Sequence, residues 1–217
     1  MMMTLSPTEL TTSATDAALA IECVMMVVYL WRAPTGDRWR PGLWCWVFGL
    51  TAFSSLLGAV AHGFEIPNSA LAALWKPLHL SLGVLVPLFL VGAIYDWRGR
   101  VVAGRLVLWS IAVGAAFFGL TEFFREPLIV FVLYEATAMV SALAIYSLLA
   151  AAHRLKGAGV VSMAILLNLA AAGAQASDIS VRIVFPFDHN GISHLVQLVG
   201  VGTLGLGLRR GMQLNAR

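Results

Sequence analysis

A chain of 217 residues with 59% hydrophobic and only 12% charged residues is too apolar for a soluble domain, in which roughly 25% of residues are charged. Its mean hydropathy is +0.84, and lipid is the solvent that suits such a surface. The net charge of +3 does not indicate a nucleic-acid partner, because the basic residues lie in short loops between apolar segments and form no patch.

Seven segments are long and apolar enough to cross a membrane, which takes about 20 mainly apolar residues in a helix. In chain order they are Ala14–Trp31, Leu43–Phe64, Leu74–Tyr95, Val101–Leu120, Leu128–Ala152, Gly157–Ala176 and Gly191–Leu208. Lipid cannot satisfy loose backbone groups, and none of these segments has the period-two alternation of a membrane strand. We therefore predict an all-α polytopic membrane protein, a seven-transmembrane helix bundle that forms one domain over residues 1–217.

Lysine and arginine are distributed unequally between the two sides of this bundle. The first, third and fifth loops and the C-terminal tail hold eleven of them: Arg32, Arg38, Arg40, Arg98, Arg100, Arg105, Arg154, Lys156, Arg209, Arg210 and Arg217. The opposite side holds three, Lys76, Arg125 and Arg182. The positive-inside bias predicts that the first side faces the cytoplasm, so that the N-terminus lies outside.

The seven tryptophans support the predicted helix ends. Tryptophan is enriched at both membrane–water interfaces, where its ring is an anchor. Here all seven stand at or near the predicted boundaries, and we expect them at the interface: Trp31, Trp39, Trp44, Trp46, Trp75, Trp97 and Trp109.

The predicted topology gathers ionisable side chains toward the outer side of the membrane. Such groups cost about 2.5–3.5 kcal/mol each inside a membrane and usually face a bundle interior or a cavity. The set contains three carboxylates and four histidines: Asp16, Glu22, Glu135, His62, His79, His189 and His194. The fifth histidine, His153, is expected in a cytoplasmic loop. We predict a polar site that opens outward; the alternative is that single residues only reach the headgroups and bind nothing.

Helical spacing identifies which of these residues share a face. Ser55 and His62 are seven residues apart, two turns of one helix. Asn190, His194 and Gln197 form a polar stripe on the seventh segment.

His189 is five residues from His194, about 140° away on a regular helix. It reaches the same centre only if the helix begins after it, with Asp188 or Asn190 as N-cap.

Several motifs resemble an uncharacterised family of bacterial seven-helix membrane proteins over nearly the whole chain. They are Thr15-Asp16, Ala61-His62-Gly63-Phe64, Leu74-Trp75-Lys76, Ala174-Gln175-Ala176-Ser177 and the run Phe187-Asp188-His189-Asn190-Gly191-Ile192-Ser193-His194-Leu195-Val196-Gln197. That family looks like a distant relative of the membrane hydrolase superfamily of alkaline ceramidases and adiponectin receptors (CREST). In those proteins one histidine of helix two and two of helix seven hold zinc, with a serine and an aspartate nearby.

The resemblance assigns roles to residues of this chain. His62 matches the helix-two ligand and His194 the second helix-seven ligand. Gly58 stands where the relatives have serine and Asn190 where they have histidine, so the third ligand has to be His189 or a carboxylate. The predicted set is His62, His189 and His194 for zinc, Asp16, Glu22 and Ser55 for catalysis, and Asn190, Gln197, His79 and Glu135 as further pocket residues.

The leading hypothesis is a zinc-dependent intramembrane hydrolase of the bacterial inner (cell) membrane. Its substrate would be a lipid amide or ester that enters from the outer leaflet, with membrane lipids as its other partners. The alternative is a non-enzymatic receptor or transporter that takes a small ligand in the same pocket. A haem protein with His62 and His194 as axial ligands is a third hypothesis. A retinal protein is not expected, because the two lysines, Lys76 and Lys156, lie at helix boundaries.

Overall fold

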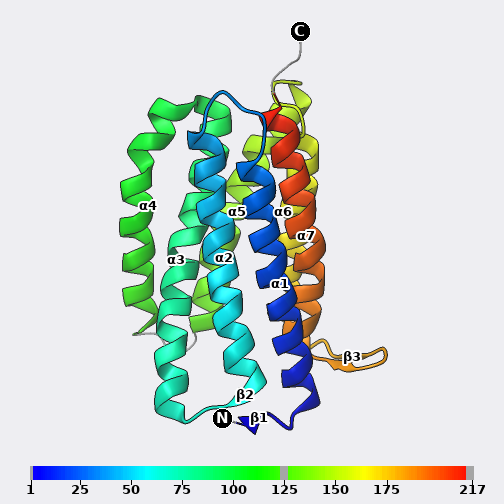
Figure 1. Cartoon of the computed structure of the whole chain (residues 1–217). Coiled ribbons are helices and arrows are strands. Elements are labelled where there is room, and N and C mark those ends of the chain that lie inside the picture. The colour runs from blue at the N-terminus through cyan, green and yellow to red at the C-terminus, as the bar shows by residue number, and fades with distance from the viewer. Residues whose placement is uncertain (1, 123–126, 214–217) are drawn as a thin grey trace.

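The computed structural model describes residues 2–122 and 127–213, with side chains from residue 130 onward in the second range. Helices dominate this part of the chain (Figure 1). They are α1 (Pro7–Trp31), α2 (Trp39–Gly63), α3 (Asn68–Arg98), α4 (Arg100–Thr121), α5 (Pro127–Ala151), α6 (Ala158–Gln175) and α7 (His189–Met212). The described part of the chain thus contains seven helices long and apolar enough to cross a membrane, as predicted.

Two helices extend further than their apolar segments indicated. α1 begins at Pro7 rather than Ala14, because the Ser6 hydroxyl caps it by accepting a hydrogen bond from the Glu9 backbone N–H at 3.5 Å. Proline at the first helical position favours the same start. α3 begins at Asn68 rather than Leu74 and is 31 residues long.

Two short antiparallel pairs lie at the end of the bundle that carries the N-terminus, here called the N-terminal end. β1 (Met2–Met3) pairs with β2 (Phe64–Glu65), so that Met3 faces Phe64. β3 (Val181–Arg182) pairs with β4 (Pro186–Phe187), so that Val181 faces Phe187. The β3–β4 hairpin projects sideways from the bundle (Figure 1).

Six helices form a closed ring. α1 packs against α2 and α7, α2 against α3, α3 against α5, and α6 lies between α5 and α7. α4 lies outside this ring and packs mainly against α3 (Figure 1). The α3–α4 crossing is close, since a Cβ atom on Gly114 would lie 2.6 Å from the carbonyl oxygen of Gly83. Helices of membrane proteins use small residues for such approaches.

A proline in α3 fixes how α5 packs. Pro87 has no N–H, so the carbonyl of Gly83 one turn earlier lacks its helical partner. The Tyr134 hydroxyl on α5 donates to that carbonyl at 2.8 Å. An unsatisfied carbonyl is costly in an apolar interior. The bond therefore favours the rotation of α5 about its axis that directs Tyr134 toward α3.

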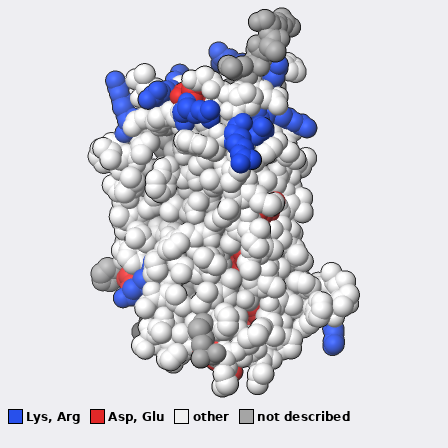
Figure 2. Space-filling model, viewed as in Figure 1, with Lys and Arg blue, Asp and Glu red and all other residues white. Residues whose placement is uncertain are grey.

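Most lysines and arginines gather at the end of the bundle that carries the C-terminus (Figure 2). This basic end holds the predicted set from Arg32 to Arg210, whereas Lys76 and Arg182 lie toward the N-terminal end. The predicted residues Arg125 and Arg217 lie outside the described residues.

A buried ion pair joins three helices at the basic end. Arg40 of α2 contacts Asp96 of α3 through Nε at 2.6 Å and Nη2 at 2.8 Å. The Tyr146 hydroxyl of α5 donates to the same carboxylate at 2.8 Å. Tyr146 is fully buried and Arg40 is buried.

The prediction that all seven tryptophans lie at the interface is wrong for Trp44. Its side chain has no exposed surface and packs edge-on against Phe89, with ring centroids 5.2 Å apart. Gly92 of α3 leaves the space that the indole occupies, because a Cβ there would lie 2.5 Å from a ring carbon. Trp44 is a core residue, placed by a glycine on the neighbouring helix.

Candidate functional site

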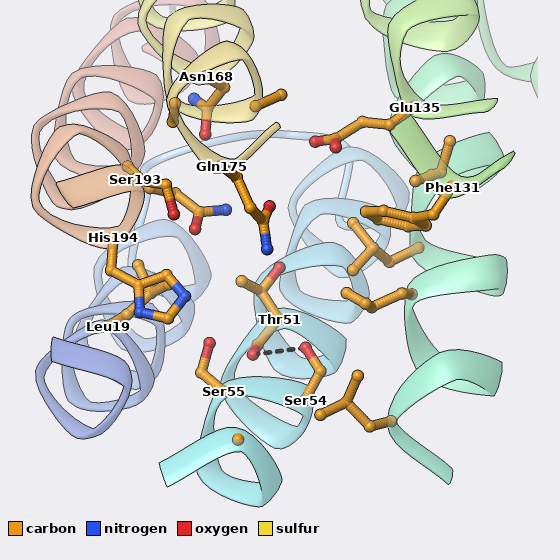
Figure 3. A pocket seen from close by; sticks show the side chains of 18 of the residues that line it. Leu19, Thr51, Ser54, Ser55, Phe131, Glu135, Asn168, Gln175, Ser193 and His194 are labelled. Atoms are coloured by element: carbon orange, nitrogen blue, oxygen red, sulfur yellow. Dashed lines mark hydrogen bonds between the residues drawn. The ribbon is translucent and has the colours of Figure 1, made fainter. Parts of the chain in front are cut away.

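A cavity of about 350 Å³ lies inside the bundle and is lined by side chains of all seven helices. This is within the usual range of small-molecule sites. Eight of the ten predicted site residues line it: Asp16, Ser55, His62, His79, Glu135, Asn190, His194 and Gln197. Figure 3 shows His194, Ser55 and Glu135 approaching the cavity from different sides.

The cavity lining changes from polar to apolar along the bundle axis. On α2, from the N-terminal end inward, the lining residues are His62, Ser55, Ser54 and Thr51, followed by Phe48 and Val47. On α7, which runs in the opposite direction, they are Asn190, Ser193, His194 and Gln197, followed by Val201 and Leu204. Both helices therefore present polar groups in the half of the cavity near the N-terminal end and apolar groups in the other half.

Asp16 and His194 form the polar centre of the first half. His194 Nε2 lies 3.6 Å from Asp16 Oδ1, and Thr15 Oγ1 lies 3.2 Å from the other ring nitrogen, Nδ1. Asp16 is only 5% exposed. Two neighbouring residues of α1 thus contact both nitrogens of one imidazole and fix the ring orientation.

Gly58 makes room for the Asp16 carboxylate. A Cβ at position 58 would lie 2.7 Å from Asp16 Oδ2, closer than real Cβ contacts permit. In this chain the absence of a side chain lets the carboxylate lie against α2, one turn from Ser55.

The start of α7 is set by Asp188. Its carboxylate caps the helix by accepting from the Gly191 backbone N–H at 2.9 Å, and the Thr12 hydroxyl of α1 donates to the same oxygen at 3.1 Å. Asp188 was one of the two predicted caps. The other, Asn190, lines the cavity instead.

His62 lies where the cavity meets the outside of the bundle. Its Nδ1 is 2.6 Å from Oε2 of Glu9, and its ring packs edge-on against Trp75, 5.8 Å between centroids. Trp75 in turn stacks on His79 at 5.8 Å. Glu9, His62 and Trp75 also border a second depression that is open to the outside, so His62 and Trp75 separate the two spaces.

Glu135 enters the cavity from α5, opposite His194 (Figure 3). Among the described residues it has no hydrogen-bond or ion-pair partner. Phe131, one turn earlier on α5, and Phe117 of α4 line the cavity beside it, with ring centroids 6.2 Å apart.

The other two predicted residues, Glu22 and His189, are not among the residues that line the cavity. Glu22 lies at the α1–α7 crossing, where a Cβ on Gly202 would be 2.8 Å from its Oε1, and its buried Oε2 has no partner. α7 begins at His189, so this residue is on the first turn and the helix does not begin after it.

The expected zinc ligands do not assemble into one centre. In residues 2–122 and 127–213 no group of three or more histidine, cysteine, aspartate or glutamate side chains could hold a metal ion. A zinc site needs three protein ligands even when one position stays open. The residues as placed do not fit that requirement, and zinc binding stays a prediction.

Six cavity residues with hydroxyl or amide side chains were not assigned to the site from the sequence: Thr51, Ser54, Thr121, Asn168, Gln175 and Ser193. Asn168 and Gln175 extend from α6 into the middle of the cavity (Figure 3). The available signal was an amide inside an apolar segment, since such a group requires a partner or a polar cavity.

The comparisons with known proteins identify the family. The model of a family of unknown function (DUF6962) matches residues 11–213. No curated protein and no solved structure matches the chain. The match runs from the first turns of α1 to the end of α7, and the chain therefore belongs to family DUF6962.

Proposed function

We propose that the bundle spans a bacterial cell membrane with its basic end in the cytoplasm and its N-terminal end outside. The gathering of lysine and arginine at one end supports this orientation through the positive-inside bias. The polar half of the cavity then lies toward the outer leaflet.

Labelling single cysteines on intact cells tests the orientation. Gly36→Cys has open space around its Cβ position, and Asp178→Cys lies on the exposed opposite loop. With Cys23 and Cys45 replaced, an impermeant thiol reagent should label Asp178→Cys and leave Gly36→Cys unlabelled until the cells are opened. Labelling of Gly36→Cys alone would reverse the orientation.

Within this bundle, we propose that the cavity binds an amphiphilic small molecule from the outer leaflet, as a receptor or transporter would. The observation that carries this is the change from polar to apolar lining along α2 and α7. A polar head would lie in the polar half, where Asp16, His194, Gln197 and Glu135 offer hydrogen-bonding groups. A hydrocarbon chain would lie among the apolar side chains of the other half, with about 25 cal/mol gained per Å² of apolar surface buried.

Filling the cavity with a larger side chain tests this function. Leu82 of α3 lines the cavity, whereas Leu80 is 40% exposed on the same helix and is not among the lining residues. In lipid nanodiscs, 1-dodecanol should raise the thermal unfolding midpoint of the wild type and of Leu80→Trp saturably, and should not do so for Leu82→Trp. Effects of dodecanol on the bilayer are common to all three proteins. Equal responses from all three would overturn the proposal.

A second candidate is the hydrolase of a lipid amide or ester expected from the resemblance. The observation that favours it is that Asp16, Ser55, His62 and His194, from three helices, line one cavity. Because the described side chains do not fit a three-ligand zinc centre, we derive no catalytic step through the metal.

Elemental analysis decides between the two candidates. Protein purified without chelator from zinc-supplemented medium should carry one equivalent of zinc if the hydrolase proposal holds, and His194→Ala should lose it. His153→Asn is the control, because His153 lies in a loop at the basic end with φ of 53°, a conformation that asparagine tolerates. If the wild type carries well under one equivalent of zinc, the hydrolase proposal fails and ligand binding remains as the proposed function.

A further inference from the structure

The cavity lining has an unbalanced charge composition. Among the described residues no lysine or arginine lines it, whereas two carboxylates do, Asp16 and Glu135. An anionic head would meet like charges in a place where water does not screen them. The lining therefore selects against fatty acids and other anionic amphiphiles.

The three histidines of the lining do not correct this imbalance for Glu135. His194 lies beside Asp16 and His62 beside Glu9. His79 stacks on Trp75, with ring centroids 5.8 Å apart. Within the described part of the chain, none of the three rings is paired with Glu135.

Of the two carboxylates that line the cavity, Asp16 has His194 beside it, whereas no cation or hydrogen-bond donor among the described residues meets Glu135. Its carboxylate points into the cavity, toward Gln175 (Figure 3). The Tyr134 hydroxyl bond to Gly83 holds this part of α5, so the neighbouring Glu135 is presented to the cavity by a fixed helix. An ionised carboxylate in a low-dielectric site without a partner is costly, so the group either takes up a proton or meets a cation that the ligand supplies.

The surroundings of Glu135 suit a cation. Phe131, one turn from Glu135 on α5, lines the cavity beside it (Figure 3), and aromatic rings attract ammonium groups. The amide oxygens of Gln175 and Asn168, which also line the cavity, can accept hydrogen bonds from the same group.

We propose that Glu135 is the counter-ion for a protonated amine, so that the ligand of this cavity is an amine-bearing amphiphile. This inference rests on the proposed ligand-binding function and adds the charge of the head group. The ammonium lies between the Glu135 carboxylate and the amide oxygens, and the chain lies in the apolar half.

Three probes with the same chain and different heads separate the two proposals: dodecylamine, 1-dodecanol and dodecanoate. Binding is measured as the saturable rise of the thermal unfolding midpoint of the full chain in nanodiscs at pH 7. The rise measured for Leu82→Trp, in which the larger side chain fills the cavity, is subtracted from each of these values. We expect dodecylamine to bind the wild type at least about tenfold more tightly than dodecanol, because charge-assisted hydrogen bonds are worth more than neutral ones. We expect dodecanoate to bind least.

Variants of Glu135 then test the residue. Glu135→Gln should abolish the preference for the amine while dodecanol binding stays, and Glu135→Asp should retain it. The control is Asp178→Asn, which removes one carboxylate from an exposed loop and should keep the preference. Equal affinity for amine and alcohol in the wild type, or an amine preference that survives in Glu135→Gln, would overturn the inference while the ligand-binding function stands. If none of the three probes binds saturably, both proposals fail.

Discussion

His194 of α7 and Asp16 of α1 face each other at 3.6 Å, and the Asp16 carboxylate lies on the far side against Gly58 of α2. Three helices therefore meet at one buried side chain. The space for that side chain exists only because position 58 has no Cβ. Any atom added there competes directly with the carboxylate.

Gly58→Ala should lower the free energy of unfolding by about 1–3 kcal/mol, the usual cost of an added methyl in a packed interior. In the Asp16→Ala background the same substitution should cost much less, because the methyl then has space. Gly49→Ala on the same helix is the control: nothing lies within 4 Å of its Cβ position, so it should be neutral or slightly stabilising. A double-mutant cycle of unfolding in denaturant measures the coupling, and additive costs would contradict this account of Gly58.

The buried pair at the basic end gives a second prediction. Asp96→Ala should destabilise the protein by about 3–5 kcal/mol, because it leaves Arg40 charged and buried without its partner. Replacing Arg40 and Asp96 together, by Met and Leu, should cost less than Asp96→Ala alone. Tyr146→Phe removes one hydrogen bond to Asp96 and should cost about 1.5–3 kcal/mol. Unfolding in denaturant is the measurement, and a harmless Asp96→Ala would refute the coupling.

The sequence predicted how deep a residue lies along the bundle axis better than it predicted which residues contact it. Hydropathy located all seven helices, and the sequence limited the N-cap of α7 to Asp188 or Asn190, of which Asp188 is the cap. Depth along each helix also placed His62, His194 and Asp16 in one layer, and these residues do line one cavity.

Rotation about a helix axis and contacts between distant helices were not available from the same patterns. The burial of Trp44 depends on Gly92 of another helix, and the partner of Arg40 is a residue near the end of α3. Among the described residues, Glu135 is isolated because the neighbouring helices place no cation or hydrogen-bond donor next to it. These features follow from contacts between helices that are distant in the chain, and the spacing of residues within one helix does not reveal such contacts.

Asp37, in the loop between α1 and α2, should make the stability of the protein depend on pH. The Tyr95 hydroxyl and the Trp39 backbone N–H donate to its carboxylate, at 2.5 and 2.9 Å, and lower its pKa below the ordinary 3.8. A carboxyl group whose pKa is lower in the folded state stabilises the protein above its unfolded pKa, and the contribution is lost as the pH falls through the folded pKa. The difference in unfolding midpoint between wild type and Asp37→Asn should therefore be constant from pH 7 to about 5 and shrink below pH 4. A difference that grows on acidification would contradict this sign.

The bond between Tyr134 and Gly83 gives the last prediction, because it exists only while Pro87 withholds an N–H from the same carbonyl. Tyr134→Phe should cost about 1–3 kcal/mol, since it leaves the Gly83 oxygen without a partner in an apolar environment. Pro87→Ala supplies a helical N–H one turn below that oxygen, so in this background Tyr134→Phe should cost about 1 kcal/mol less. The comparison is a double-mutant cycle in nanodiscs, with Tyr29→Phe as the matched control. An equal cost of Tyr134→Phe in both backgrounds would show that the hydroxyl does not substitute for the missing backbone bond. Because Glu135 follows Tyr134 directly, Tyr134→Phe should also weaken the preference for dodecylamine over dodecanol, and Pro87→Ala should not restore it.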